Sequence, residues 1–404
     1  MPYPTLTVAL LCGLLVAPAY AAPDSPGTES LGSISRSAES RGTEAQLVKS
    51  LQAIKDSRLD IALNEVDSLL QANPNFKLAQ LVKGDLLMAH AGAIENFGSA
   101  PNASHVEIEN LRDEARVRLQ RVLSQPDTKL APRFLWQMDP EQKYALVVDT
   151  SRSTLYVYEN VNGAPRYVAD FYTTIGKLGA EKTVEGDQRT PIGVYFLQAK
   201  LPKNKLSDFY GNGAYPLSYP NEWDRKNQRT GSGIWLHGTP SNTYSRPPRA
   251  SNGCVVLANE DVDKLAPYLQ AGITPVIIAN HMSWSNEQDI GARAELLQSV
   301  EQWRKDWSSL DTDAYLKHYS PTFANDSMDY SAWAKQKQQV NSAKSWVKVN
   351  LSNISLFAYP EQPDLVVVNF EQDYSSNNLS NRMKKRQYWM KQNNLWKIIY
   401  EGAA

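Results

Sequence analysis

A histidine and a cysteine are the two residues of this sequence best suited to do chemistry together. His237 ends an apolar segment and precedes Gly238, while Cys254 directly follows Gly253 after a polar loop. A thiol attacks as the thiolate, and because it is little ionised near neutral pH, a nearby imidazole is its usual activator. Gly253 adds no side chain beside the sulfur, which leaves space for a substrate carbonyl and backbone N–H groups for its oxyanion. The pattern predicts Cys254 as nucleophile and His237 as base.

The cysteine count points to the same residue. The chain has 2 cysteines, Cys12 and Cys254. Cys12 lies in an apolar run that is followed by Ala19-Tyr20-Ala21, and residues 1–21 therefore predict a secretory signal peptide and export to the periplasm. Cleavage would leave Cys254 alone. A lone thiol in an exported protein is reactive, intermolecular or buried and inert, and the count by itself leaves these alternatives open.

Length and charge limit which other classes of function are compatible with this sequence. The 404 residues predict several domains, and 42 Lys and Arg balance 43 Asp and Glu. No long run of like charge is present, which argues against a nucleic-acid partner. After the signal peptide no apolar segment approaches the roughly 20 residues that span a bilayer, so we expect no transmembrane segment. The histidines outside the pair lack the close spacing of a zinc site, so we expect neither metal nor cofactor; they are His90, His105, His281 and His318.

The segments before the pair predict a linker and a helical region. Residues 22–43 are rich in Ser, Gly and Pro, as flexible linkers are. Across residues 44–138 apolar residues recur at helical spacing as far as Gln125, with an interruption at Asn73-Pro74. One helical hairpin resembles a tetratricopeptide repeat, without a clear second copy. Both plain packing and binding of a protein partner are open for this region.

The pair itself lies in a predicted β domain. Residues 139–281 are dominated by β-branched and aromatic segments, beginning with the strand expected at Tyr144 to Asp149. Residues 288–404 predict helices followed by long antiparallel strands, which is an α+β domain. The expected fold class is therefore multidomain: an N-terminal α-helical region, a mainly-β domain with the His–Cys pair, and a C-terminal α+β domain.

Two separated motifs in the β domain occur in a family-specific order. They are His237-Gly238-Thr239 followed by Ser251-Asn252-Gly253-Cys254, and, upstream, Gly186-Asp187-Gln188-Arg189-Thr190-Pro191-Ile192-Gly193-Val194-Tyr195. This arrangement resembles the L,D-transpeptidase catalytic domain, also called the YkuD domain. The resemblance implies a mainly-β catalytic fold, Cys254 as nucleophile, His237 as base and the Gly238 carbonyl as the group that orients the imidazole. Since only the main chain of Gly238 would be needed, we expect Gly238→Ala to be far milder than loss of His237.

The sequence departs from this family at two positions. Asn252 stands where many members have His, and Val256 stands where many have Arg. A substrate carboxylate would then depend on Arg249 or Arg246 of the preceding loop, although we favour the interpretation of Arg249 as a plain solvated loop residue. We predict the backbone N–H groups of Gly253 and Cys254 as oxyanion donors. The side chains predicted to contact substrate are those of Ser251, Asn252, Arg249, Thr239, Trp235 and Tyr219.

The C-terminal domain resembles the NTF2-like fold. The resemblance rests on aromatic spacing ahead of the long strands, at Trp303, Trp307, Tyr315 and Phe323. It implies a pocket that binds glycan or cell-wall substrate. The alternative is that these aromatic side chains simply fill the interior of the domain.

Together these observations predict a periplasmic peptidoglycan L,D-transpeptidase. Cys254 would transfer an acyl group from a tetrapeptide stem through a thioester, so the expected partners are peptidoglycan stem peptides. A glycan or protein partner could bind the helical and NTF2-like regions. With water as acceptor, the same site would be an L,D-carboxypeptidase or amidase. A third alternative, of another class, is a non-catalytic cell-wall-binding protein.

Overall fold

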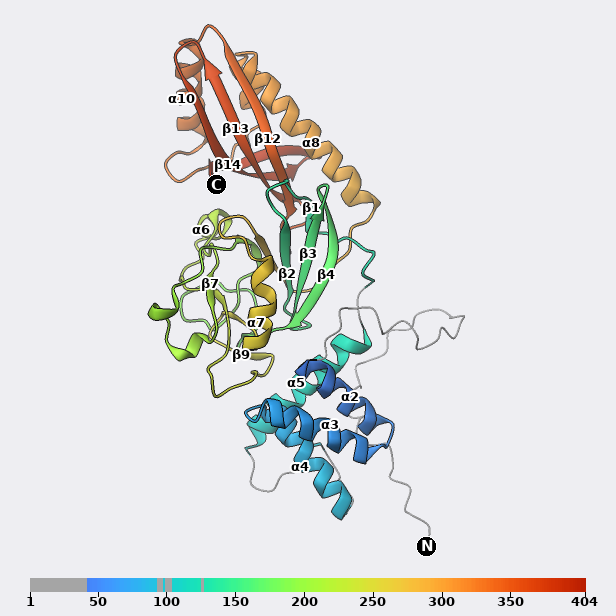
Figure 1. The fold of residues 1–404 in the computed structure, drawn as a ribbon. Helices are drawn as coiled ribbons and strands as arrows, with labels where there is room; N and C mark the ends of the chain where they lie inside the picture. The colour runs from blue at the N-terminus through green and yellow to red at the C-terminus, as the bar shows by residue number, and fades with distance from the viewer. Residues whose placement is uncertain (1–41, 93–96, 99–103, 125–126) are drawn as a thin grey trace.

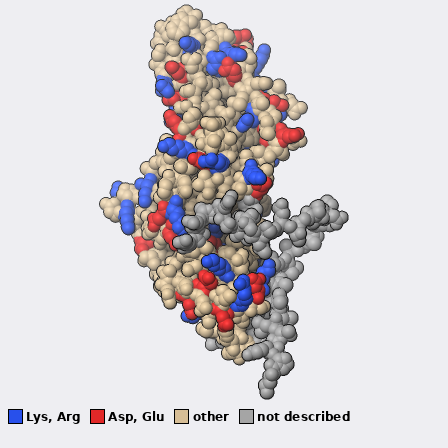
Figure 2. All heavy atoms as spheres, turned by 45° about the vertical axis from the view of Figure 1, so that its right-hand side comes forward, with Lys and Arg blue, Asp and Glu red and all other residues tan. Residues whose placement is uncertain are grey.

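The computed structural model describes residues 42–92, 97–98, 104–124 and 127–404, and Figure 1 shows three bodies: helices, a β-rich body, and long strands flanked by helices. The predicted signal peptide lies outside the described residues, and so does the predicted linker except for Gly42 and Thr43. Within the described part, no helix is both long and apolar enough to cross a membrane. Basic and acidic side chains are interspersed on the face shown in Figure 2.

The N-terminal body consists of α2 (Thr43–Lys55), α3 (Leu59–Ala72), α4 (Lys77–Ala91) and α5 (His105–Leu123). These helices place their apolar residues on one face, and the faces meet in a common core. The chain leaves α3 at Asn73-Pro74 because proline has no N–H to continue the helix and disfavours the helical conformation of the residue before it. Fully buried side chains of this core are Leu47, Ala62, Val66, Leu69, Leu78 and Val82.

The segment after α5 differs from the helical region that we expected up to residue 138. Residues 135–137 form β1 (Leu135–Gln137), which pairs antiparallel with β12 (Val347–Ala358) of the C-terminal sheet. Three residues are too few for a periodic signal, so the sequence could not reveal this strand. The chain therefore contributes to the last sheet before it enters the β-rich body.

The β-rich body is built on a five-stranded sheet with the order β4-β3-β2-β11-β6. The strands are β2 (Tyr144–Asp149), β3 (Thr154–Val161), β4 (Ala164–Tyr172), β6 (Gly193–Phe196) and β11 (Pro275–Ala279). The central strands β2 and β11 are nearly continuous apolar runs, as is typical of strands that are buried on both faces, whereas most of β4 is partly exposed. Leu146 and Val276 contribute to the core on one face, whereas Val147 and Ile277 contribute to a second core on the other.

A smaller sheet with the order β10-β8-β7 carries the His–Cys pair. Its strands are β7 (Ala214–Pro216), β8 (Trp235–His237) and β10 (Val255–Val256), and a separate pair is formed by β5 (Ile175–Gly176) and β9 (Arg249–Ser251). Two short helices, α6 (Glu222–Lys226) and α7 (Asn259–Leu265), and the 3₁₀ turns η1 (Lys203–Lys205), η2 (Asp208–Tyr210) and η3 (Ala266–Tyr268) complete the body. Leu236 and Val255 pack this sheet onto the core of the larger one.

The C-terminal body has a sheet with the order β1-β12-β13-β14-β15. Its remaining elements are α8 (Glu287–Ser308), α9 (Thr312–Leu316), α10 (Tyr330–Ser342), β13 (Leu365–Ser376), β14 (Ser380–Gln392) and β15 (Leu395–Ala403). A capping box between Asn286 and Asp289 starts α8 by satisfying its first N–H groups. The aromatic residues named from the sequence, Trp303, Trp307, Tyr315 and Phe323, are buried and contribute to its core.

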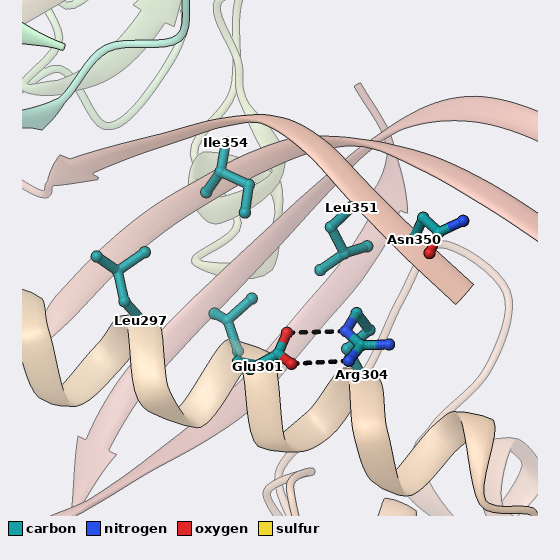
Figure 3. Close-up of a pocket in the computed structure, with 7 residues that line it drawn as sticks. Leu297, Glu301, Arg304, Asn350, Leu351 and Ile354 are labelled. Carbon is teal, nitrogen blue, oxygen red and sulfur yellow. Dashed lines mark hydrogen bonds and ion pairs between the residues drawn. The ribbon is translucent and has the colours of Figure 1, made fainter. Parts of the chain in front are cut away.

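The β-rich and C-terminal bodies share a core. Val147 and Ile277 of the five-stranded sheet belong to the same buried cluster as Phe357 and Tyr388 of the C-terminal sheet. On the outer side of the C-terminal body, a cavity of about 210 Å³ lies between α8 and β12. Figure 3 shows its lining, in which the carboxylate of Glu301 accepts two hydrogen bonds from Arg304. Because Arg304 also donates to the Val349 carbonyl, its charge is already engaged.

Candidate active site

Parallel pairing of two short strands places His237 and Cys254 on one side of the small sheet. In β8 and β10, Leu236 lies opposite Val255 and His237 lies opposite Val256. Leu236 and Val255 are fully buried on the core side. Because side chains alternate along a strand, His237 faces away from that core, as does Cys254 directly before β10. The small sheet thereby presents both side chains on the same face.

His237 is held as a neutral imidazole in a defined tautomer. Its Nδ1 lies 2.6 Å from the Gly238 carbonyl oxygen, which can only accept, so Nδ1 carries the proton and Nε2 is left as the base. The ring is 1% exposed and packs against Tyr210 and Phe209 at centroid distances of 5.1 and 5.8 Å. Burial lowers the pKa of His237 to about 4, and the positive charge of Arg246 adds to this effect against the Gly238 hydrogen bond.

Cys254 is partly exposed and lies against the backbone that leads into β8. Its Sγ is 3.5 Å from the Gly233 carbonyl oxygen. Burial raises the pKa of the Cys254 thiol, while the Trp235 backbone N–H and the charge of Arg246 act in the opposite direction. A raised thiol pKa beside a lowered imidazole pKa makes the resting pair neutral.

The turn before the cysteine is fixed by Ser251 and Thr190. Ser251 Oγ accepts from the Gly253 N–H at 3.0 Å and donates to the Cys254 carbonyl at 2.7 Å. Thr190 Oγ1 donates to the Gly253 carbonyl at 2.9 Å, which connects the upstream motif to the nucleophile. Gly253 has a φ of 123°, and a Cβ there would lie 2.7 Å from the Arg189 carbonyl oxygen. The upstream sequence motif contains Thr190, but the motif alone did not predict this contact.

Two of these contacts change the roles predicted from sequence. Ser251 is buried, and its hydroxyl supports the turn with one donated and one accepted hydrogen bond, so we assign it to the turn and not to substrate. The Gly253 N–H already has Ser251 as acceptor, which leaves the Cys254 N–H as the donor that we keep in the oxyanion proposal.

Gly238 is more constrained than its main-chain role suggested. A Cβ on Gly238 would lie 2.2 Å from Asn259 Oδ1. That oxygen accepts from the Asn212 N–H at 2.9 Å, and Asn259 Nδ2 donates to the Thr239 carbonyl at 2.8 Å. The structure argues against a mild effect of Gly238→Ala, because the added methyl group would displace an amide that braces the segment after His237. No motif in the sequence identified Asn259.

The side chains predicted to contact substrate fall into two groups, those that are at least partly exposed and those that are buried in the domain. Asn252 and Arg249 are exposed, and Trp235 is half-buried against Tyr210 at a centroid distance of 4.7 Å. These three can meet a ligand.

Thr239 and Tyr219 are part of the scaffold instead. Thr239 is buried and donates to the Tyr244 carbonyl at 3.2 Å. Tyr219 is buried, donates to the Thr230 carbonyl at 2.9 Å and packs edge-on against Tyr195. We therefore leave both out of the substrate contacts proposed below.

The described ranges contain no ligand set for a metal. No group of three or more His, Cys, Asp or Glu residues there could hold a metal ion. His318 lies 2.7 Å from Asp306 in the C-terminal body, and His281 contacts Ser151. These two histidines therefore have hydrogen-bond partners other than Cys254.

Two family models and several solved structures match the chain. The sequence model of the L,D-transpeptidase catalytic domain matches residues 143–278, and that of the Cds6 C-terminal NTF2-like domain matches residues 295–402. The structure of Bd1075 from Bdellovibrio bacteriovorus is 31% identical with a TM-score of 0.60, and the match covers 68% of this chain and 98% of Bd1075. The chain belongs to the YkuD-type L,D-transpeptidase family.

The helical cell shape determining protein Pgp2 from Campylobacter jejuni is also similar. Its structure is 25% identical with a TM-score of 0.59, over 69% of this chain and 96% of Pgp2. The structure of a point mutant of Pgp2 is 27% identical with a TM-score of 0.58, over 67% of this chain and 94% of the mutant. No curated protein matches the sequence. The chain is thus an L,D-transpeptidase-like cell-wall protein with a C-terminal NTF2-like domain.

Proposed function

We propose that this protein is a peptidoglycan L,D-transpeptidase that acts by cysteine acyl transfer on tetrapeptide stems. The observation that carries the proposal is the tautomer of His237. The 2.6 Å hydrogen bond from Nδ1 to the Gly238 carbonyl leaves Nε2 as a base on the face of the sheet that also presents Cys254. Export to the periplasm, where this substrate lies, belongs to the same proposal.

The first half-reaction forms a thioester. As Sγ attacks the carbonyl carbon of the third stem residue, His237 Nε2 takes the thiol proton, and the Cys254 N–H stabilises the oxyanion. Collapse of this intermediate breaks the amide bond to the terminal D-amino acid. The imidazolium returns its proton to the leaving amine, so the free D-amino acid departs and the acyl group stays on sulfur.

The second half-reaction restores the thiol. An acceptor amine attacks the thioester while His237 takes its proton, a new amide forms, and the leaving sulfur regains the proton. Water as acceptor would make the same site an L,D-carboxypeptidase. Because Pgp2 is described as a protein that determines helical cell shape, we extend the proposal to a role in cell-wall remodelling that shapes the cell.

The proposal is tested by incubating the purified protein with defined disaccharide-tetrapeptides and measuring product masses. Cross-linked dimers with release of the terminal D-amino acid are expected. Tripeptides alone would replace the transferase by the hydrolytic alternative. No product and no acyl adduct from a folded protein would favour the non-catalytic cell-wall-binding alternative.

Variants assign the reaction to the pair. Cys254→Ser, His237→Gln and the double variant should lose similar amounts of turnover, because groups that act in one step are strongly non-additive. The matched control is His281→Gln, which removes an exposed histidine that contacts Ser151. Turnover by His237→Gln close to that of the control would contradict the assignment.

A further inference from the structure

The end of the C-terminal body that lies farthest from the β-rich body carries exposed apolar side chains. Strand β13 ends there, at the upper end of Figure 1, where the β13–β14 turn meets the loop between α10 and β12. We call this end the tip and define it as residues 340–348 and 376–380. Trp346 is 49% exposed, Leu379 is 52% exposed, and Val340 in the last turn of α10 is exposed as well. Because large apolar side chains gain free energy on leaving water, such a cluster marks a binding surface.

Hydrogen bonds join the two segments of the tip. The Ser345 N–H donates to Asn377 Oδ1 at 3.2 Å, and Lys344 Nζ donates to Ser376 Oγ at 3.1 Å. Ser376 also closes the β13–β14 turn, since its N–H donates to the carbonyl of the exposed leucine at 2.8 Å. These bonds hold the residues on either side of the turn next to Trp346. The exposed apolar side chains of the two segments therefore lie together in a fixed arrangement.

The tip is also positively charged. It contains Lys344 and Lys348 and neither Asp nor Glu. No acidic residue occurs in the sequence from residue 330 to residue 360, which covers α10, the loop after it and β12. A cationic surface with apolar side chains among its lysines is complementary to an anionic partner that also accepts apolar groups.

The acidic side chains that precede the tip on β13 lie beside an arginine. Glu371 pairs with Arg382 at 2.7 Å, and Asp373 lies opposite Arg382 in the β13–β14 register. Neither Lys344 nor Lys348 takes part in the ion pairs of the described residues, and Lys344 donates to neutral side-chain oxygens instead. Two ammonium groups are thus left to meet an external anion.

The combination of side chains favours a lipid surface over a glycan or a protein partner. Trp is enriched where membranes meet water, and peripheral proteins bury Trp and Leu there while Lys contacts anionic headgroups. A glycan site would instead present hydrogen-bonding groups around an aromatic face in a concave pocket, whereas Leu379 offers an aliphatic side chain on a turn. A stable protein interface requires a broad patch of about 800 Å² on each partner, and the tip consists of two short segments.

We propose that the tip docks this protein on the surface of a bilayer that contains anionic phospholipids. Trp346 and Leu379 enter the headgroup region, and Lys344 and Lys348 contact the lipid phosphates. The docking is peripheral and uses no membrane-spanning segment. β13 has 12 residues and extends from the tip toward the β-rich body, so it holds that body about 40 Å from the lipid surface.

The first test is co-sedimentation of the full protein with vesicles. Wild type should bind vesicles of equal parts phosphatidylglycerol and phosphatidylcholine, bind pure phosphatidylcholine much more weakly, and dissociate as salt is raised. Since each lysine near an anionic surface contributes about 5-fold to partitioning, Lys344→Gln with Lys348→Gln should lower binding about 25-fold. The matched control is Lys203→Gln with Lys205→Gln, which removes two exposed lysines of the β-rich body.

The apolar contribution has its own variant and control. Trp346→Ser with Leu379→Ser should lower binding about 10-fold. Leu395→Ser removes a leucine that is 59% exposed where β14 turns into β15, at the opposite end of the sheet, and should leave binding unchanged. Wild type that does not bind the anionic vesicles overturns the proposal. Equal losses in the tip variants and their controls, with all proteins folded by circular dichroism and thermal unfolding, overturn the assignment to the tip.

A second measurement locates the tip at the lipid and separates the other partners. Brominated phosphatidylglycerol vesicles should quench the tryptophan fluorescence of wild type, and Trp346→Phe should lose most of that quenching. Unchanged quenching in Trp346→Phe contradicts insertion of this residue. Binding to purified peptidoglycan sacculi is measured with the same variants. If the tip variants lose sacculus binding and keep vesicle binding, the tip is a wall-polymer site and the lipid proposal is refuted.

Discussion

The protonation state of His237 yields the most demanding prediction. Burial lowers the pKa of this imidazole from 6.5 to about 4. Since a tenfold change in proton affinity corresponds to about 1.4 kcal/mol, the folded protein disfavours the imidazolium by roughly 3 kcal/mol. If neutral His237 is the base, acylation should persist well below pH 6 and decline only near pH 4. A thiolate–imidazolium pair would instead show a thiolate at neutral pH and would lose activity at alkaline pH, where its imidazolium loses the proton.

Single-turnover acylation of a tetrapeptide donor between about pH 3.5 and 8 measures this acid limb. Absorbance at about 240 nm reports the thiolate in parallel, and we expect none at neutral pH because burial raises the pKa of Cys254. Alkaline pH should restore part of the acylation rate of His237→Ala, and the pH needed should lie above the pKa of an ordinary thiol. An acid-limb midpoint near the ordinary histidine pKa of about 6.5 would refute the lowered pKa of His237. A thiolate band at neutral pH that disappears in His237→Ala would refute the neutral pair.

The same pKa makes a prediction about stability. Folded His237 binds its proton more weakly than the unfolded chain does, so the unfolded state gains protons first as the pH falls from about 6.5 to 4. The contribution of His237 to stability is thus present above about pH 6.5 and declines by up to roughly 3 kcal/mol through that window. The free energy of unfolding in urea is measured for wild type and His237→Gln at about pH 7 and 4.5. We expect wild type to lose more stability than the variant between these two pH values. Parallel pH dependence in the two proteins would contradict it.

Three further substitutions test the supports of the site. Gly238→Ala should slow acylation by about 100-fold or more because its methyl group meets Asn259 Oδ1, and Asn259→Ala in the same chain should restore part of the rate. Arg118→Met should lower the free energy of unfolding in urea by about 3–5 kcal/mol, since buried carboxylates lose their partner, whereas the more exposed control Arg116→Met changes it by less than about 1 kcal/mol. Ser251→Ala should reduce kcat about 10-fold with little change in KM, because the turn that holds the nucleophile loosens; a KM effect alone would restore the predicted substrate contact.

The sequence was sufficient for the three-part fold class, and it singled out His237 and Cys254 as a candidate pair, because both inferences rest on local signals. An apolar strand ending in His237 and a glycine turn before Cys254 are short-range patterns, and the long strands of the last domain alternate clearly. The family assignment and the multidomain fold class are confirmed by the comparisons. The roles of the individual site residues stay predictions.

What the sequence could not reveal depends on contacts between distant segments. Asn259 lies in α7 and contacts the segment after His237 across the fold, and Arg118 of α5 lies over the ring of Tyr172 in β4. Neither contact has a periodic or motif signature. Tyr219 shows a different limit of the sequence. An aromatic residue near a strand gives the same sequence pattern whether it contacts a ligand or is buried in the core. Here Tyr219 is buried and donates a hydrogen bond to the Thr230 carbonyl.

The two neighbouring bodies constrain the β-rich body from opposite directions, and this explains why the chain needs all three. The face of the five-stranded sheet with Val147 and Ile277 is covered by Phe357 and Tyr388 of the C-terminal sheet, so removing that sheet would expose a large apolar patch. No described residue of the helical body belongs to this buried cluster, and that body instead contacts the loop at residues 244–246 through the stacking of Tyr244 on Phe76 and the hydrogen bond from Ser245 to Glu114. Hydrophobic burial by one neighbour thus stabilises the scaffold, whereas directional contacts from the other fix the loop beside Cys254. Loss of the first should unfold the β-rich body, and loss of the second should leave it folded with residues 244–246 displaced; thermal unfolding and circular dichroism of variants at each interface distinguish the two outcomes.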